Sequence, residues 1–307
     1  MHLTDSETLQ EVSKLLLLSI GAALLLFLWQ GNAGFDLGDE GYLWYGVQSV
    51  LFGEVPIRDF MAYDPGRYYW SAFLAVLLGD DGILVLRGAA AFFQVAGLWI
   101  ALLVISRSEQ RPAFLFYLLV VVALSAWMLP RHKLFDISIA ILLIGVLTYL
   151  IHNPSARRYL ITGLCVGVAA VFGRNHGVYG VAASLLAIAW LQFNRESGPR
   201  LIKSFLFWSA GVVTGYLPVL VMAIAIPGFA SAMWESIRFL FEYKATNLSL
   251  PVPWPWAVSF GQLGIVEVLR GVLIGLLFIA IPVFGVSGLI WLFLQGSKLN
   301  LVSPGLV

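Results

Sequence analysis

Two adjacent carboxylates, Asp39 and Glu40, stand in the most polar stretch of the chain, where they could accept a proton or bind a cation. They open the segment 40–52, whose apolar residues recur at helical spacing and predict an amphipathic helix. Such a helix would hold both carboxylates against a membrane surface. Acids at a helix start also stabilise the helix dipole, so capping is a second interpretation of the pair.

A second polar group lies in two short turns further along the chain. These turns contain Arg131, His132, Lys133, Asp136, Arg174 and His176. Charges next to apolar segments are costly in a membrane, and they tend to mark either function or ion pairing. Two interpretations stay open: ion pairs with the carboxylates of the first polar loop, or binding of an anionic ligand. Snorkelling to the interface would suit Arg131 alone.

The composition places these residues in a membrane protein. Of the 307 residues, 60% are hydrophobic and 11% are charged, whereas about a quarter of an average soluble domain is charged. The net charge of +1 gives no basic field for nucleic acid. Cys165 is the only cysteine, which excludes an internal disulfide and a cysteine metal cluster.

Apolar runs predict an all-α fold in one transmembrane domain, residues 1–307, with about eight membrane-spanning helices. The spans begin near residues 14, 84, 112, 135, 158, 177, 204 and 268. With this arrangement the basic residues of the connections fall on one face, which the positive-inside rule assigns to the cytoplasm together with both termini. They are Arg107, Arg111, Arg157, Arg158, Arg195, Arg200, Lys203 and Lys298. Glycines spaced four apart, at 163 and 167 and at 211 and 215, weakly suggest close helix packing.

The outer loop 32–83 is expected to hold two in-plane helices. From Pro65 to Leu78 a helix would measure about 21 Å, which is short of the roughly 30 Å hydrocarbon core. Asp64 suits its N-cap and Gly79 its end. A later outer loop, 227–262, combines an amphipathic segment with a proline-tryptophan run and is a candidate lid.

Three segments of the first outer loop resemble the corresponding loop of the GT-C glycosyltransferases. They are Leu37-Gly-Asp-Glu-Gly-Tyr42, Gly53-Glu-Val-Pro-Ile-Arg-Asp-Phe60 and Asp64-Pro-Gly-Arg-Tyr-Tyr-Trp70. That family includes protein mannosyltransferases and the aminoarabinose transferases of lipid A. Asp136 matches the acid that the family tends to carry at the outer start of the fourth span. The resemblance covers residues 1 to about 200 and departs at Asp64-Pro65-Gly66, where many members have Pro-Pro.

The resemblance implies inverting transfer of a sugar from a polyprenyl-phosphate donor to an acceptor hydroxyl. Asp39 would be the base, and Glu40 and Asp136 would orient it or share a divalent ion with it. Whether a metal is used stays open. The resemblance also implies a set of substrate-binding residues, among which Arg131, Lys133 and Arg174 would bind the phosphate. The set is Arg58, Asp59, Tyr63, Asp64, Arg67, Arg131, His132, Lys133, Arg174 and His176.

The implied partners are the lipid-linked donor, a glycan, lipid or protein acceptor, and membrane lipids. The implied location is the plasma (inner) membrane, with the site facing outside. Two other classes stay open: a non-catalytic, lipid-binding assembly protein, and a transporter or flippase of a lipid-linked or anionic substrate. Against the transporter, the charges cluster on one face instead of at the midplane, and no repeated pair of broken helices is present.

Overall fold

The computed structural model describes residues 5–107, 113–193, 199–243, 254–259, 261 and 264–295. Within these ranges the regular structure is helical, apart from one isolated bridge between Pro56 and Phe60. The structure forms two compact units, Met1–Ser236 and Ile237–Val307. Each unit is described by itself.

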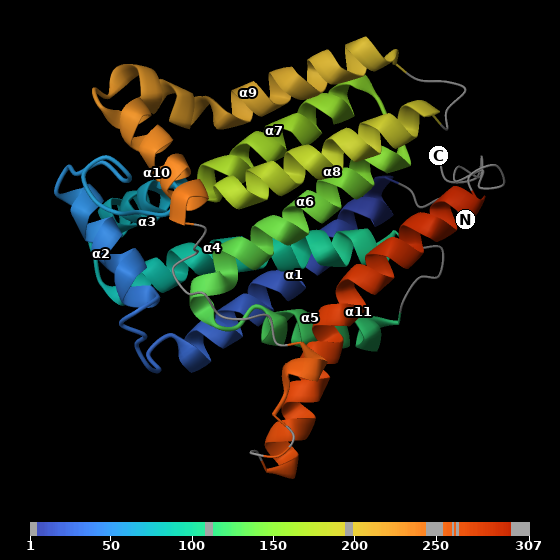
Figure 1. Ribbon diagram of the computed structural model, residues 1–307, viewed down its shortest axis with the longest axis horizontal. Helices are drawn as coiled ribbons and strands as arrows, with labels where there is room; N and C mark the ends of the chain where they lie inside the picture. Colours follow the sequence, from blue (N-terminus) through green and yellow to red (C-terminus); the bar gives the residue numbers. More distant parts are fainter. Residues whose placement is uncertain are drawn as a thin grey trace. The chain divides into compact units, whose positions relative to one another are not determined.

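The helices of the first unit follow the expected order (Figure 1). They are α1 (Asp5–Gln30), α2 (Glu40–Leu51), α3 (Pro65–Leu78), α4 (Ile83–Ser106), α5 (Phe114–Trp127), the 3-10 turn η1 (Arg131–Lys133), α6 (Leu134–His152), α7 (Ala156–Phe172), α8 (Arg174–Phe193) and α9 (Leu201–Ala225). Helix α10 (Phe229–Tyr243) crosses the boundary between the units. The second unit contains η2 (Pro255–Ala257) and α11 (Ile265–Gln295).

Among the described residues, six helices are long and apolar enough to cross a membrane, which makes the chain a multi-pass membrane protein. They are Leu9–Gln30, Ile83–Ser106, Arg131–His152, Arg174–Phe193, Leu201–Ala225 and Ile265–Trp291. The other two predicted spans are present as helices, but α5 has 14 residues and α7 has 17. The sequence therefore placed all eight helices correctly, and six of them meet the length of a span.

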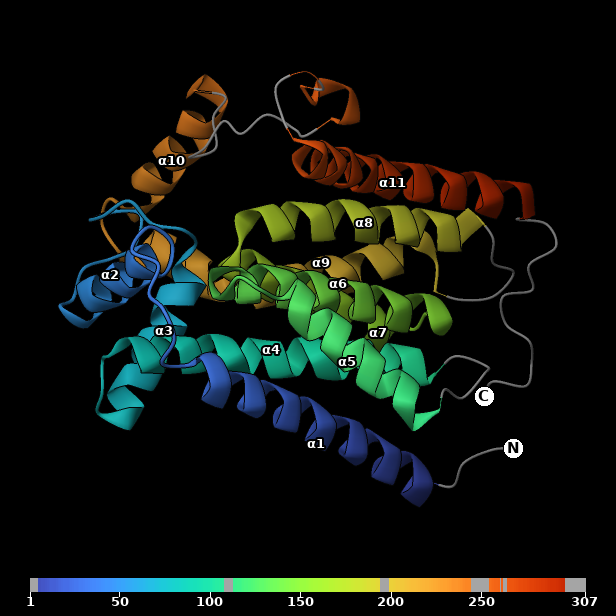
Figure 2. The ribbon, with the colours of Figure 1, turned by 90° about the horizontal axis from the view of Figure 1, so that it is seen from below.

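The long helices of the first unit run side by side, so that successive connections alternate between two ends of the bundle (Figure 2). One end holds α2, α3, η1 and the junction of α7 with α8. The other end holds the basic residues Arg107, Arg157, Arg158, Arg200 and Lys203, as the positive-inside pattern predicts. Arg111, Arg195 and Lys298 lie outside the described residues.

Helices α7 and α9 approach backbone to backbone through the four glycines spaced in pairs. A Cβ at Gly163 would stand 2.0 Å from the carbonyl oxygen of Trp208, and a Cβ at Gly215 would stand 2.2 Å from that of Leu164. Any side chain there would force the helices apart. The glycine spacing therefore does mark helix packing, as the sequence weakly suggested.

The loop 32–83 contains the two predicted helices: α3 has the predicted bounds, and α2 ends at Leu51, one residue earlier than predicted. Leu43 and Val47 of α2 pack against Tyr68 and Ala72 of α3 in a small hydrophobic core. The carbonyl oxygen of Asp81, beyond the end of α3, accepts hydrogen bonds from Trp44 and Gln48 of α2 at 2.8 and 2.9 Å. The loop after α3 is thereby fixed beside α2.

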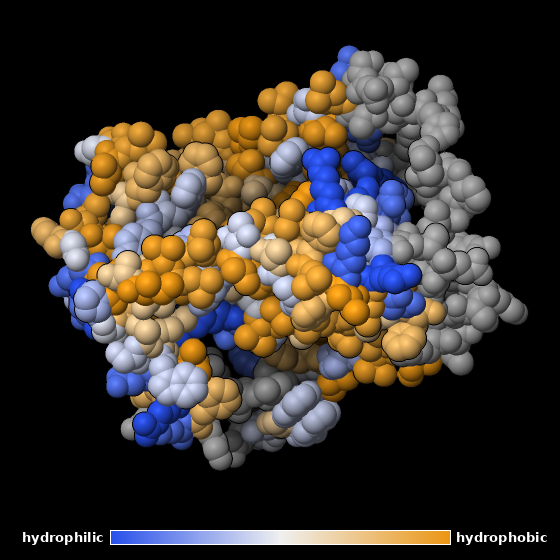
Figure 3. All heavy atoms as spheres, turned by 90° about the horizontal axis from the view of Figure 1, so that it is seen from above, coloured by the Kyte–Doolittle hydropathy of each residue, from blue (hydrophilic) through white to orange (hydrophobic). Residues whose placement is uncertain are grey.

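Hydrophobic side chains cover most of the helix surface seen in Figure 3, and hydrophilic ones gather toward the helix ends. Large apolar side chains are exposed on the long helices, for example Leu25 of α1 at 70% exposure and Phe92 of α4 at 60%. Soluble proteins rarely expose apolar patches of this extent, and a bilayer would cover them.

In the second unit, η2 packs on α11. The side chain of Val258, directly after η2, lies next to Gly271 of α11, where an added Cβ would be 3.0 Å from Val258 Cγ2. The rings of Trp254 and Trp256 stack with centroids 5.1 Å apart. The candidate lid, 227–262, lies partly outside the described residues, which leave out 244–253, 260 and 262.

Candidate functional site

The predicted site residues come together at one end of the first unit, where α2, α3, η1, α6 and α8 begin. The long loops and short turns of the sequence meet there because every second connection of the bundle falls on that end (Figure 2). The arrangement consists of several ion pairs around one half-exposed carboxylate, Asp39.

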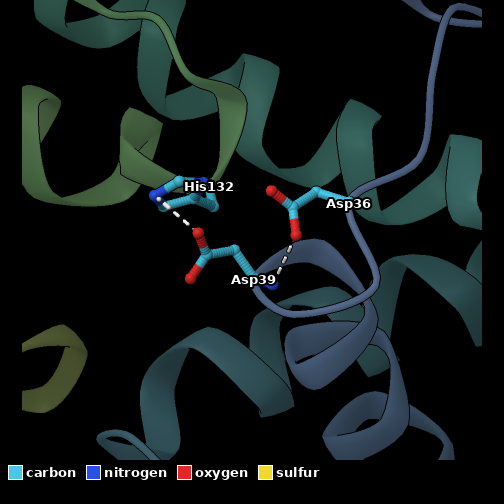
Figure 4. A group of neighbouring side chains, drawn as sticks. All are labelled: Asp36, Asp39 and His132. Atoms are coloured by element: carbon cyan, nitrogen blue, oxygen red, sulfur yellow. Dashed lines mark hydrogen bonds and ion pairs between the residues drawn. The ribbon is translucent and has the colours of Figure 1, made fainter. Parts of the chain in front are cut away.

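Asp39 points toward His132 of η1, and Asp36 lies beside them (Figure 4). The Nε2 atom of His132 stands 3.3 Å from an Asp39 carboxylate oxygen, and the Asp39 side chain is 46% exposed. Asp39 occupies the N-cap of α2, but its side chain makes no capping hydrogen bond. Instead Asp36 Oδ1 accepts hydrogen bonds from the backbone N–H groups of Gly38 and Asp39. Capping therefore does not explain the Asp39 carboxylate.

Glu40 is buried and held by two arginines. Arg87 of α4 donates from Nε and Nη2 to the two carboxylate oxygens, at 3.0 and 2.7 Å. Arg131 donates from Nε to Oε1 at 3.0 Å. Burial opposes ionisation of Glu40, but the hydrogen bonds from Arg87 and Arg131 outweigh it and lower the pKa of the carboxyl to about 2. Both carboxylate oxygens are thereby occupied, so Glu40 is a structural anion.

Arg131 is one of the cations that the sequence assigned either to a phosphate or to the first loop's carboxylates. The structure shows the second arrangement. Besides Glu40, its guanidinium donates to the backbone carbonyl oxygens of Gln30 and Ala33, both at 2.8 Å. These bonds fasten the end of α1 and the start of α2 to η1, and they use the donors that a phosphate would need.

Asp136 is bound in the same way, by Arg67 of α3. The two terminal nitrogens of Arg67 donate to the two Asp136 oxygens, and its Nε donates to the carbonyl of Phe172 at 2.6 Å. The guanidinium also lies over the rings of Tyr63 and Phe135. His176 of α8 approaches the pair, with Nδ1 at 3.8 Å from Asp136 Oδ1.

Asp64 sits at the N-cap of α3 as predicted, but its side chain makes no capping bond there. It accepts from the backbone N–H of Arg174 at 2.7 Å and pairs with the Arg174 guanidinium, also at 2.7 Å. Burial raises the pKa of the Asp64 carboxyl, and the Arg174 charge offsets part of that rise. Arg174 further donates to Ser236 Oγ, so this cation is also engaged.

The remaining predicted residues differ in whether their charged or polar groups already have a partner. Arg58 and Asp59 form an ion pair with each other at 2.7 Å. The hydrogen bonds that Asp59 accepts from Arg58 and from the Val55 N–H lower the pKa of its carboxyl to about 2. Burial raises the pKa of the Tyr63 phenol, and the nearby charge of Asp39 adds to that rise. Lys133 is exposed and makes no ion pair with any described residue.

The side chains that could hold a metal ion differ in part from those that the sequence named. Asp36, Asp39 and His132 each offer one atom, and the three lie within 4.8 Å of one another. The sequence named Asp39, Glu40 and Asp136, but the oxygens of Glu40 and Asp136 face arginines. Among the described residues only Asp39 is common to both groups.

Two contributors were missed by the sequence analysis, Arg87 and Asp36. The signal for Arg87 was available, because an arginine within an apolar span is expected to have a partner or a function. Asp36 carried no such signal, since its proximity to His132 depends on the fold. A cavity of about 20 Å³ beside Glu40, Arg87 and Arg131 has room for about one water. This cavity is too small for a larger ligand.

Comparison of the chain with protein-family models, with curated proteins and with solved structures found no match. The site and the membrane-spanning helices carry the functional argument by themselves.

Proposed function

We propose that the protein is a membrane glycosyltransferase of the GT-C kind, which transfers a sugar from a polyprenyl-phosphate donor to an acceptor hydroxyl. One observation carries the proposal: Asp39 is half exposed and pairs with no arginine among the described residues, whereas Glu40 is bound by two arginines and Asp64 and Asp136 by one each. A carboxylate oxygen that no arginine occupies is open to an acceptor hydroxyl, whose proton it could take.

In this reaction Asp39 accepts the proton of the acceptor hydroxyl as its oxygen attacks the anomeric carbon. The new C–O bond forms as the bond to the phosphate breaks, which inverts that carbon and releases polyprenyl phosphate. Lys133 is the cation best suited to the departing phosphate, because Arg131 and Arg174 are committed to carboxylates. His132, in contact with Asp39, orients the base.

The proposal includes a topology. All eight predicted helices cross the membrane, α2 and α3 lie in the plane of the outer surface, and both termini are cytoplasmic. The site then faces outward from the plasma membrane, where a polyprenyl chain can stay in the bilayer while its sugar phosphate reaches Asp39. The basic residues Arg107, Arg157, Arg158, Arg200 and Lys203, at the end of the first unit away from the site, support this orientation.

A second candidate, a non-catalytic lipid-binding assembly protein, is favoured by a separate observation. The arginines that would hold a phosphate are bound to carboxylates, so the cluster has the form of a structural network. A transporter has no comparable support, because these charges lie at helix starts at one end of the unit.

The test is turnover by the purified protein in lipid nanodiscs. Polyprenyl-phosphate hexose and pentose donors are supplied with mixed glycan, lipid and peptide acceptors, and released polyprenyl phosphate is measured. The transferase predicts release that depends on an acceptor. Donor binding without release would select the assembly protein instead.

A further inference from the structure

A groove of about 540 Å³ runs along the first turns of α9, at the basic end of the first unit and away from Asp39. It is lined by Arg200, Ile202, Lys203, Leu206, Phe207 and Ala210. Its volume falls in the range of about 300–1,000 Å³ that is typical of ligand clefts. Nothing in the proposed transfer reaction uses it.

The groove has a charged end and an apolar remainder. Arg200 and Lys203 stand at the start of α9, and the lining residues that follow along the helix are apolar. Neither cation makes an ion pair with a described residue, and both are exposed. No described acid therefore compensates these two positive charges, which stand next to an open hydrophobic surface where Ile202 is 75% exposed and Leu206 is 61% exposed.

The two cations and the apolar wall together indicate the chemical class of the ligand. A soluble anion would neutralise the cations but leave the hydrophobic wall open, and an uncharged lipid would cover the wall but leave the cations unpaired. A molecule with an anionic headgroup and an acyl chain satisfies both. Basic residues at the end of a membrane helix also attract anionic headgroups electrostatically.

We propose that this groove binds one anionic phospholipid from the leaflet at the basic end of the bundle. Its phosphate lies between Arg200 and Lys203, and one acyl chain follows the apolar side chains of Leu206, Phe207 and Ala210. The proposal is independent of the transferase reaction, because the groove and Asp39 lie at opposite ends of the unit.

The experiment is a binding titration of the full chain in phosphatidylcholine nanodiscs or micelles, followed by native mass spectrometry. Short-chain phosphatidylglycerol is the probe, with phosphatidylcholine and inorganic phosphate as comparisons. Arg200→Gln and Lys203→Gln should each weaken phosphatidylglycerol binding roughly fivefold. Ala210→Phe should weaken it as well, because the added ring fills the groove without changing the charge.

Arg107→Gln is the matched control, since it removes one exposed charge from the same end of the bundle and does not line the groove. Binding in this variant should equal that of the native protein. An equal loss in all three charge variants would overturn the proposal, because general attraction to the surface would explain it. Phosphatidylcholine or inorganic phosphate binding as tightly as phosphatidylglycerol would also overturn it. Thermal unfolding in phosphatidylcholine alone checks that every variant is folded.

Discussion

The carboxylate of Glu40 is bound inside the bundle by Arg87, and each of the two side chains is less than a tenth exposed. The pair joins the start of α2 to α4, and Arg131 adds η1 to the same carboxylate. Three segments that are distant in the sequence are thus fixed by one buried anion. Its removal would leave two arginines without their partner.

Glu40→Gln is accordingly expected to destabilise the protein by about 3–5 kcal/mol, the cost of breaking a buried ion pair from one side. The measurement is thermal or denaturant unfolding in detergent. Glu54→Gln is the control, because Glu54 is exposed and lies in the same loop, 32–83, and it should change stability by less than about 0.5 kcal/mol. Native stability of Glu40→Gln would show that Glu40 does not hold the loop.

Ionisation of the Glu40 carboxyl should also make the stability of the protein depend on pH. The folded pKa of Glu40, about 2, lies below its ordinary value of 4.5. A depressed folded pKa adds stability above pH 4.5, and that stability is lost as the pH falls toward 2. Unfolding measured across this window should show a decline that is smaller in Glu40→Gln, since glutamine does not titrate. Parallel curves for the two proteins would contradict the assignment.

Asp39→Asn tests the proposed base. The change keeps the size of the side chain and removes its charge, and it breaks no capping bond because Asp39 makes none. Turnover is expected to fall by roughly 10²- to 10⁴-fold, the usual contribution of a general base, at nearly native stability. Asp81→Asn, at another exposed acid of the same loop, should leave the rate unchanged. Transfer at the native rate by Asp39→Asn would exclude Asp39 as the base.

Much of the fold was predictable because its signals are local. Length and hydropathy placed the eight helices, and the bounds of α3 followed from Pro65 and Gly79, which suit a helix start and end. The pairing within the site was not predictable. Which of Arg67, Arg87 and Arg131 meets which carboxylate depends on helix packing, and residues 47 to 91 positions apart form these bonds. Local patterns identified most of the charged residues but not their partners.

Arg131 and Lys133 are two residues apart and are expected to respond differently to loss of charge. Arg131→Gln removes bonds to Glu40 and two carbonyls, and it should lower stability by about 1–3 kcal/mol. Lys133→Gln breaks no described ion pair, and it should leave stability unchanged.

If Lys133 holds the donor phosphate, its variant should bind polyprenyl phosphate more weakly by about 1.5–3 kcal/mol, or roughly tenfold to a hundredfold. Thermal stability and polyprenyl-phosphate affinity are measured on both variants. Unchanged affinity in Lys133→Gln would remove the phosphate role from this residue.

The proposed in-plane position of α3 can be tested with single cysteines in a Cys165→Ala background. Glu54 precedes α3 and Asp81 follows it, and both are exposed. Glu54 is preferred to its neighbour Gly53, whose φ of +90° disfavours any side chain. Arg107, at the end of α4, is the control for the opposite end of the bundle.

Glu54→Cys and Asp81→Cys should both react with a membrane-impermeant reagent added to intact cells, and Arg107→Cys should react only after permeabilisation. The physical reason is that α3, whose 14 residues extend about 21 Å against a core of roughly 30 Å, has the segments before and after it at the same end of the bundle. Helix α5 is equally short, but Arg107 and η1, which flank it, lie at opposite ends. The hydrogen bonds from Trp44 and Gln48 to the Asp81 carbonyl also keep the loop after α3 beside α2. Reaction at only one of Glu54→Cys and Asp81→Cys would mean that α3 crosses the membrane, and every later connection would then change sides.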